Sequence, residues 1–325
     1  MTAPSVALVL GAGGLTGGAF HAGVLAALQE GLGWDSRRAA VVVGTSAGSM
    51  TGAALRAGLA PVDLFARAVD APLTPAGARL VRSMPAAPTQ FPLRRDARKA
   101  ASRRPAAAAS IGRMAMSRAS LGAFAAALLP RGEIAIAELA AAFDPLFRDA
   151  WPADALWVCA VRLFDGRRVV FGRDATGVPV ARAVAASCAI PGYFAPVDID
   201  GVDHVDGGVH SPTNLDLVAG RGHDVVVVSS PMSIAGRALR LAADAPVRRA
   251  CRAFLDREAI AVRRRGTPVV AFQPTVDDVA VMGVNAMDAE RRSRVARQAR
   301  ESTLRRLDLP DTRQRLEALV SSSAP

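Results

Sequence analysis

The first sixty residues contain two short apolar runs, each of which leads into a glycine-rich turn and then into a helical pattern. Residues 5–10 (SVALVL) and 40–43 (AVVV) have the branched composition of buried strands. Helical patterns follow at residues 17–30 and from Ser46 to Ala57. Because successive strand–turn–helix units place their strands side by side, we predict an α/β fold with helices covering a mostly parallel central sheet.

The remainder of the chain continues this alternation less regularly. We predict further strands at residues 155–164 and 168–172, joined at Asp165-Gly166, and at 195–205, 224–229 and 268–272. We predict further helices at residues 119–129, 134–147, 178–188 and 285–307, the last of them basic and amphipathic. Because the 325 residues are 51% hydrophobic, intrinsic disorder of the whole chain is excluded.

The net charge of +11 is concentrated in one segment. Residues 79–118 carry ten basic side chains and one acidic side chain, a net charge of +9, and residues 83–118 within them are rich in proline and alanine. Such a surface can contact the phosphate groups of an anionic membrane, or it can be a solvated insertion without a partner. Nucleic acid is not expected, since the segment has almost no aromatic side chains to stack on bases.

The cysteines and histidines predict neither a disulfide framework nor a metal site. Cys159, Cys188 and Cys251 are far apart and odd in number, and no histidine–carboxylate cluster has the spacing of metal ligands. We expect no membrane-spanning helix, because no run of 18 strongly apolar residues is present. The first apolar run also lacks the length and basic flank of a signal peptide, so a cytoplasmic location is predicted.

A G-x-S-x-G pentapeptide, formed by residues 44–48, joins the second strand to its helix. A strand–turn–helix setting is what a nucleophile elbow requires, and Gly44 and Gly48 allow the tight turn. Ser46 then projects its hydroxyl at a helix N-terminus, where developing negative charge is favoured. The alternative is that Thr45 or Ser46 only caps the helix.

The glycine loop after the first strand, residues 11–18 (GAGGLTGG), exposes backbone amides. Such amides can form an oxyanion hole or cradle a pyrophosphate. The dinucleotide interpretation fits poorly, because Thr16 occupies the third glycine position of the G-x-G-x-x-G pattern. A nicotinamide-dependent oxidoreductase would also match this sequence only in the first strand and the glycine loop. A third interpretation is that the glycines only permit close packing of helix and strand.

Asp206, followed by Gly207 and Gly208, is a candidate general base on an unhindered turn. The alternative is an Asx turn, in which the carboxylate bonds its own backbone. A histidine could also serve as the base for Ser46. His21 is expected to pack on the first helix, whereas His210 and His223 remain candidates.

Together these blocks resemble those of the patatin-like phospholipase family. They follow one another in the family's order and span residues 5–232. The glycine loop GAGGLTGGAFHAGVL comes first and GTSAGS follows it. An alanine-, serine- and proline-containing segment, ASCAIPGYFAPV, occupies residues 186–197, and DGGVHSPTN occupies residues 206–214. Four blocks in the right order are much more specific than any one of them.

The resemblance implies a patatin-like three-layer α/β/α fold and a serine–aspartate dyad that needs no cofactor. Ser46 would be the nucleophile, Asp206 the general base, and the amides of Gly13 and Gly14 the oxyanion hole, with glycines at 11, 44, 48, 207 and 208 as motif support. The substrate would be a phospholipid or related lipid ester. Thr16 departs from the family, where a basic residue is common, and this departure supports the alternative of a catalytically silent lipid- or anion-binding protein.

The resemblance also divides the chain. We expect an acyl hydrolase domain over residues 5–232, in which residues 83–118 form a candidate lid. A mainly helical extension over residues 233–325 would pack on it, with a further strand near 268–272. Residues 79–118 are the candidate contact with an anionic membrane surface, which would make the protein peripherally membrane-associated.

Overall fold

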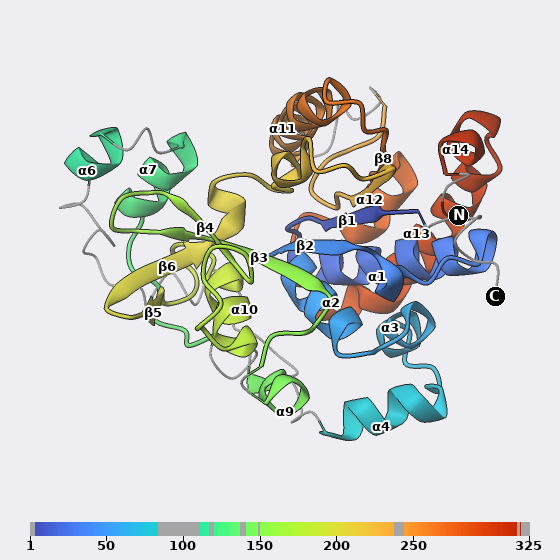
Figure 1. Cartoon of the computed structure of the whole chain (residues 1–325), viewed down its shortest axis with the longest axis horizontal. Coiled ribbons are helices and arrows are strands. Elements are labelled where there is room, and N and C mark those ends of the chain that lie inside the picture. The colour runs from blue at the N-terminus through green and yellow to red at the C-terminus, as the bar shows by residue number, and fades with distance from the viewer. Residues whose placement is uncertain are drawn as a thin grey trace.

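The computed structural model describes residues 4–83, 111–116, 120–136, 141–148, 150–236, 244–316 and 319. Within them one sheet has the strand order β5-β6-β3-β2-β1-β7-β8, and β4 pairs with β3 (Figure 1). Its strands are β1 (Val6–Leu10), β2 (Val41–Thr45), β3 (Ala155–Arg162), β4 (Arg168–Phe171), β5 (Val197–Ile199), β6 (Val202–Asp206), β7 (Val225–Ser229) and β8 (Val269–Phe272). The neighbours from β3 to β8 pair in parallel, whereas β4 and β6 run antiparallel to β3.

Both faces of this sheet are buried. Leu8, Leu10 and Val42 belong to the core on one face, and Ala7 and Val9 belong to the core on the other. Helices α1 (Gly14–Leu32), α2 (Ala47–Arg56) and α10 (Val180–Cys188) cover the first face, and α11 (Ala245–Arg263) covers the second (Figure 1). A parallel sheet covered on both faces explains why its strands are continuous apolar runs. The predicted three-layer α/β/α fold is confirmed.

Several predicted elements are found close to their expected places. The runs at residues 5–10, 40–43, 224–229 and 268–272 form β1, β2, β7 and β8, and the hairpin at Asp165-Gly166 joins β3 to β4. The alternating segment 195–205 is a second hairpin, β5–β6. Asp200 and Gly201 both have positive φ angles, 53° and 78°, at its tip, and such paired angles are typical of tight hairpin turns.

Two helix predictions were wrong in part. Among the described residues of the predicted helix 134–147, Ile134 instead pairs with Phe194 in a β-bridge, whereas Ala141 is helical and the short helix α9 spans Asp144–Phe147. The predicted helix 285–307 begins at Arg292, as α13 (Arg292–Leu307), after a short 3-10 turn. In both cases backbone groups that a helix would use internally bond elsewhere. The carbonyl of Ile134 accepts from the amide of Ala195, and that of Ala286 accepts from the amide of Thr16.

The last ninety residues contribute to the same sheet and the same core. β8 pairs in parallel with β7, and α13 packs along α1. A Cβ on Gly23 of α1 would lie 2.4 Å from the carbonyl oxygen of Ala296, so the absence of a side chain lets the two helices approach. The remaining described helices are α3 (Pro61–Ala68), α4 (Pro75–Ser83), α6 (Ile111–Met116), α7 (Leu121–Leu128), α12 (Val276–Met282) and α14 (Pro310–Arg315).

Most of the basic segment 79–118 and of the candidate lid 83–118 lies outside the described residues. Its role at a membrane surface therefore stays a prediction, as does the division of the chain after residue 232. Among the helices that the structure describes, none is both long enough and apolar enough to cross a bilayer.

Candidate active site

Ser46 lies on a sharp turn between β2 and α2. Its φ of 54° and ψ of −122° are a conformation that residues other than glycine rarely adopt. Strain of this kind persists only where the surroundings impose it, and it is the geometry of a nucleophile elbow. The side chain of Ser46 makes no capping hydrogen bond to α2. The capping alternative for Ser46 therefore fails.

The two flanking glycines are sterically required. A Cβ on Gly48 would lie 2.0 Å from the carbonyl oxygen of Leu10, and a Cβ on Gly44 would lie 2.5 Å from the Cα of Ser49. Both distances are far below van der Waals contact, and both obstacles are backbone atoms. The pentapeptide glycines thus let the start of α2 pack directly against the ends of β1 and β2.

Strand pairing brings Asp206 to the elbow. Thr45, the last residue of β2, pairs with Cys159 of β3, and Asp206, the last residue of β6, pairs with the next residue, Ala160. The ends of β2 and β6 therefore meet at consecutive positions of β3. A Cβ on Gly207 would lie 2.3 Å from the carbonyl oxygen of Cys159, so the glycine after Asp206 permits this close approach.

The carboxyl group of Asp206 is buried, and no ion pair between described residues includes it. Burial raises its pKa from 3.8 to about 6. Its interaction with the Ser46 hydroxyl and a 2.7 Å hydrogen bond from the amide of Gly208 oppose the rise. The bond from Gly208 is the expected Asx turn, and it coexists with the approach to Ser46. The carboxylate is thus a stronger base than an exposed one and is mostly ionised at neutral pH.

The glycine loop presents free amides beside Ser46. Gly13 precedes α1, and Gly14, with a φ of 62°, begins it. A Cβ on Gly14 would lie 2.7 Å from the carbonyl oxygen of Ala286. Among the described residues, the amides of Gly13 and Gly14 have no acceptor, whereas the amide of Gly11 donates to the carbonyl of Ser229. Gly14 and Ser46 line the same cavity, so the loop offers donors at the helix N-terminus next to the serine.

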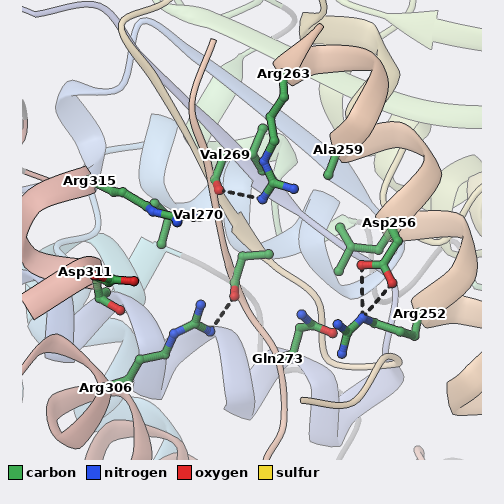
Figure 2. A pocket seen from close by; sticks show the side chains of 13 residues that line it. Arg252, Asp256, Ala259, Arg263, Val269, Val270, Gln273, Arg306, Asp311 and Arg315 are labelled. Atoms are coloured by element: carbon green, nitrogen blue, oxygen red, sulfur yellow. Dashed lines mark hydrogen bonds and ion pairs between the residues drawn. The ribbon is translucent and has the colours of Figure 1, made fainter. Parts of the chain in front are cut away.

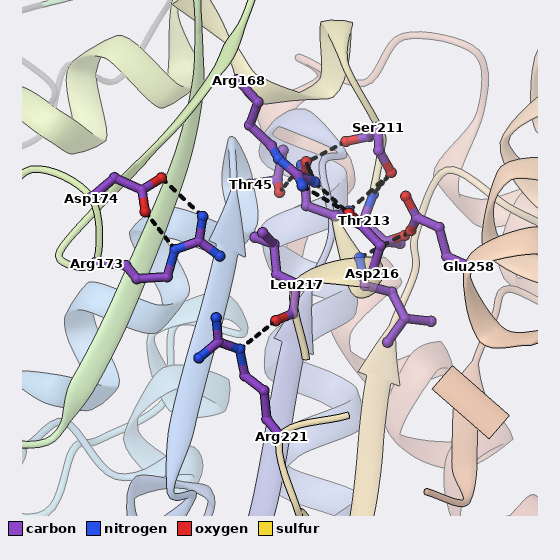
Figure 3. A network of polar contacts seen from close by, with 12 residues as sticks. Thr45, Arg168, Arg173, Asp174, Ser211, Thr213, Asp216, Leu217, Arg221 and Glu258 are labelled. Carbon is purple, nitrogen blue, oxygen red and sulfur yellow. Dashed lines mark hydrogen bonds and ion pairs between the residues drawn. The ribbon is translucent and has the colours of Figure 1, made fainter. Parts of the chain in front are cut away.

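A hydrogen-bond network behind the elbow connects β2 to the segment after Asp206 (Figure 3). The side-chain amide of Asn214 donates to the hydroxyl of Thr45 over 3.0 Å and to the carbonyl of Ser211 over 2.8 Å. Asn214 itself is buried and has a φ of 52°. Thr45 is thereby held on the side of the turn away from the cavity, which fixes the direction of the neighbouring Ser46.

Two charged side chains complete this network from distant elements. Arg168 of β4 makes two 2.7 Å hydrogen bonds to Asp216 and one of 3.0 Å to the Oδ1 of Asn214. Glu258 of α11 accepts from the hydroxyl of Thr213 and from the amide of Leu215 (Figure 3). Arg168 and Glu258 were not predicted from the sequence, because no local pattern connects β4 and α11 to this segment. Asn214 belonged to the DGGVHSPTN block, but no role was assigned to it.

Helix α10 also contacts the elbow. The hydroxyl of Ser187 accepts a 2.9 Å hydrogen bond from the amide of Ser46. Cys188 lines the cavity beside Ser46, and burial raises the pKa of its thiol to about 12. The thiol therefore stays protonated and does not compete as a nucleophile. Both residues lie in the ASCAIPGYFAPV block, whose sequence alone predicted no role for either of them.

The histidines are held elsewhere. His21 is fully buried, with its ring nitrogens bonded to the hydroxyl of Ser229 and the carbonyl of Gly11, and burial lowers its pKa to about 4. His223 contacts Ser5, and His204 contacts the carbonyl of Val202. Within the described part of the chain, no hydrogen bond joins His210 or another histidine to Ser46. The geometry therefore favours Asp206 as the partner of the serine.

A cavity of about 230 Å³ opens beside Ser46. The facing sides of α1 and α2 form its walls, and most of its lining is apolar, including Ala22, Met50, Phe143 and Phe194. It extends along the two helices from Gly14 and Ser46 toward Ala22 and Ala54. An apolar groove that begins at a nucleophile is suited to hold a hydrocarbon chain.

A second cavity, of about 280 Å³, lies at the edge strand β8 and holds four arginines (Figure 2). Arg263 donates to the carbonyl of Val269, Arg306 to that of Ala271, and Arg252 pairs with Asp256. None of the residues assigned to the elbow, the glycine loop or the Asp206 turn lines it. The candidate active site is therefore the cavity at Ser46.

Comparison with known proteins identifies the family. A model of the family described as patatin-like phospholipase matches residues 8–219, which include the glycine loop, the elbow and the Asp-Gly-Gly turn. The chain belongs to the patatin-like phospholipase family. No curated protein sequence matches it. Among solved structures, it is similar to VipD from Legionella pneumophila, with a TM-score of 0.41, 14% sequence identity, and coverage of 94% of this chain and 67% of that one.

Membership of the patatin-like phospholipase family implies lipid acyl hydrolase activity. The order of the blocks in the sequence already predicted this family. The matched region ends thirteen residues before the expected domain boundary at residue 232 and begins three residues after residue 5.

Proposed function

We propose that this patatin-like protein hydrolyses carboxylic ester bonds of phospholipids or related lipids, with Ser46 as nucleophile and Asp206 as general base. The observation that carries the proposal is the meeting of a strained serine with a buried carboxylate whose pKa is about 6. A general base is most effective when its pKa lies near the working pH. The apolar cavity beside Ser46 and the family match support a lipid substrate.

In the first half of the reaction, Asp206 accepts the proton of the Ser46 hydroxyl as the oxygen attacks the ester carbonyl. The carbonyl oxygen becomes an oxyanion, for which the amides of Gly13 and Gly14, without an acceptor in the described part of the chain, are the proposed donors. When the tetrahedral intermediate collapses, the bond to the alcohol breaks and the alcohol takes the proton from Asp206. The acyl group remains as an ester of Ser46.

The second half repeats these steps with water. Asp206 accepts a proton from the water that attacks the acyl-enzyme, and the same amides stabilise the second oxyanion. Ser46 then leaves with that proton, and a fatty acid is released. Positive potential at the N-termini of α1 and α2 favours negative charge at both stages.

The test is turnover of a soluble neutral ester, p-nitrophenyl butyrate, by the full chain. We expect wild type to hydrolyse it, and Ser46→Ala to lose at least a thousandfold in kcat. Ser83→Ala is the matched control, since Ser83 is exposed and its hydroxyl, among the described residues, bonds the carbonyl of Leu80. Folded wild-type protein that binds lipid vesicles without hydrolysing either this ester or the vesicle lipid would favour the catalytically silent alternative.

A further inference from the structure

Two arginines line the otherwise largely apolar cavity at Ser46. They are Arg67 near the end of α3 and Arg292 at the start of α13, elements that are more than 200 residues apart in the sequence. No acidic side chain lines this cavity among the described residues. The cavity therefore combines a candidate nucleophile, an apolar groove and two positive charges. A hydrocarbon chain alone would make no favourable electrostatic contact with those charges.

The packing of α13 along α1 gives the position of Arg292. A Cβ on Gly23 would meet Ala296 and Ala299, and a Cβ on Gly31 would meet Leu304 and Leu307. The constant offset shows that the helices run parallel, and it places Arg292 beside Ala19, which also lines the cavity.

Ala19 lies five residues after Gly14, or about 7.5 Å along a helix. The backbone of Arg292 is therefore displaced by about this distance along the groove from the loop that faces the reacting ester.

Arg67 is half-buried. Burial lowers the pKa of its guanidinium group, and the nearby positive charge of Arg292 lowers it further. Arg292 pairs with Asp70, but 73% of that side chain is exposed, so solvent screens the pair. Arg292 can thus reorient toward a ligand at little cost. The Arg292 side chain is 45% exposed, whereas Arg67 is half-buried, and an anion between the two guanidinium groups would relieve their repulsion.

We propose that Arg67 and Arg292 select substrates that carry an anionic group several bonds from the scissile ester. The inference rests on the proposed function of Ser46 and deepens it. The selected group is a phosphate on the alcohol side of the ester or a carboxylate at the far end of the acyl chain. In either case guanidinium groups bind its negatively charged oxygen atoms.

The test compares kcat/KM for four short esters, two anionic and two neutral, below their micellar concentration. They are 1-hexanoylglycerol, which is neutral, 1-hexanoylglycerol 3-phosphate, and the mono-p-nitrophenyl ester of adipic acid, for which p-nitrophenyl hexanoate is the neutral partner. Wild type is compared with Arg67→Gln, Arg292→Gln and the double variant. Arg294→Gln is the control, because Arg294 lies on the same helix, is exposed and does not line the cavity.

We expect wild type to prefer at least one anionic ester over its neutral partner by about tenfold or more, since a hydrogen bond to a charged group supplies that much. The double variant should lose this preference, mainly through a higher KM, while Arg294→Gln keeps it. A preference for the phosphate places the anion on the alcohol side, and a preference for the adipate places it on the acyl side. No preference in wild type, or an equal fall on neutral and anionic esters in the double variant, would overturn the proposal.

A binding measurement separates this inference from the hydrolase proposal. Isothermal titration of the Ser46→Ala variant with hexyl phosphate and with hexanoate does not depend on turnover. Binding of either anion that the added substitutions at positions 67 and 292 abolish supports the arginine pair even if wild type hydrolyses nothing. Binding that survives both substitutions, or no binding of either anion, contradicts it whatever the esterase assay shows.

Discussion

Replacing Asp206 with asparagine should stabilise the protein at alkaline pH while removing its activity. The folded-state pKa of Asp206 is about 6, against an ordinary value of 3.8. The native state therefore holds this proton more tightly than the unfolded chain does. The contribution to stability is fully present below about pH 4 and is lost as the pH rises through 6. A difference of about two pKa units corresponds to about 3 kcal/mol of unfolding free energy.

Asparagine is nearly isosteric with aspartate, cannot ionise, and can still accept the hydrogen bond from the amide of Gly208. We would measure the unfolding free energies of Asp206→Asn and wild type in urea from pH 4 to pH 8. Relative to wild type, the variant should become more stable by about 3 kcal/mol over this range. Ester hydrolysis should fall at least a hundredfold, since the proposed base is gone.

Asp203→Asn is the matched control on the same strand. Asp203 pairs with Arg131 near the surface, where solvent screens the pair and limits its contribution. Its removal should therefore not reproduce the growing alkaline advantage of Asp206→Asn. Unfolding free energies of Asp206→Asn and wild type that stay parallel from pH 4 to pH 8 would refute the raised pKa. The assignment of Asp206 as a tuned base would then lose its physical support.

Three further predictions follow from the site. For a neutral soluble ester, kcat/KM should rise about tenfold per pH unit up to about pH 6 and then level off, because only ionised Asp206 accepts the serine proton; a profile that still rises at pH 8 would contradict this. Gly48→Ala should give no soluble folded protein by circular dichroism, since its Cβ would lie 2.0 Å from a backbone oxygen, whereas Gly177→Ala, with no atom within 4 Å, should fold. Ser187→Ala should lower the unfolding free energy by about 1–3 kcal/mol, because the buried amide of Ser46 loses its acceptor; unchanged denaturant midpoints would count against that contact.

The parts of this structure that could be predicted from the sequence are those fixed by neighbours along the chain. β1, β2 and β7 are continuous apolar runs because the sheet is covered on both faces, and the glycines at the elbow mark a close backbone approach. The residues assigned to the active site, Ser46 and Asp206, belong to short blocks whose types and spacing carry the chemistry. The structure adds that β3 aligns the two strand ends that hold them.

The parts that could not be predicted depend on contacts between distant segments. Arg168 and Glu258 reach the segment after Asp206 from β4 and α11, and no local pattern distinguishes them from the many other charged residues. Ile134 was expected in a helix because its neighbours are alanine-rich, yet it pairs with Phe194. Arg292 meets the active-site cavity only because α13 packs along α1. For Ile134, tertiary packing overrides local propensity, and the three charged residues are placed by contacts between segments far apart in the sequence.

The central claim is that Ser46 is an activated nucleophile, and covalent labelling tests it most directly. Wild type, Ser46→Ala and Ser83→Ala would be treated with a fluorophosphonate probe at pH 7.5, after circular dichroism has shown that all three are folded. We expect one adduct on wild type and on Ser83→Ala, located at Ser46 by peptide mass spectrometry, and none on Ser46→Ala. Labelling of Ser46→Ala to the same extent as wild type, or no labelling of folded wild type, would contradict it.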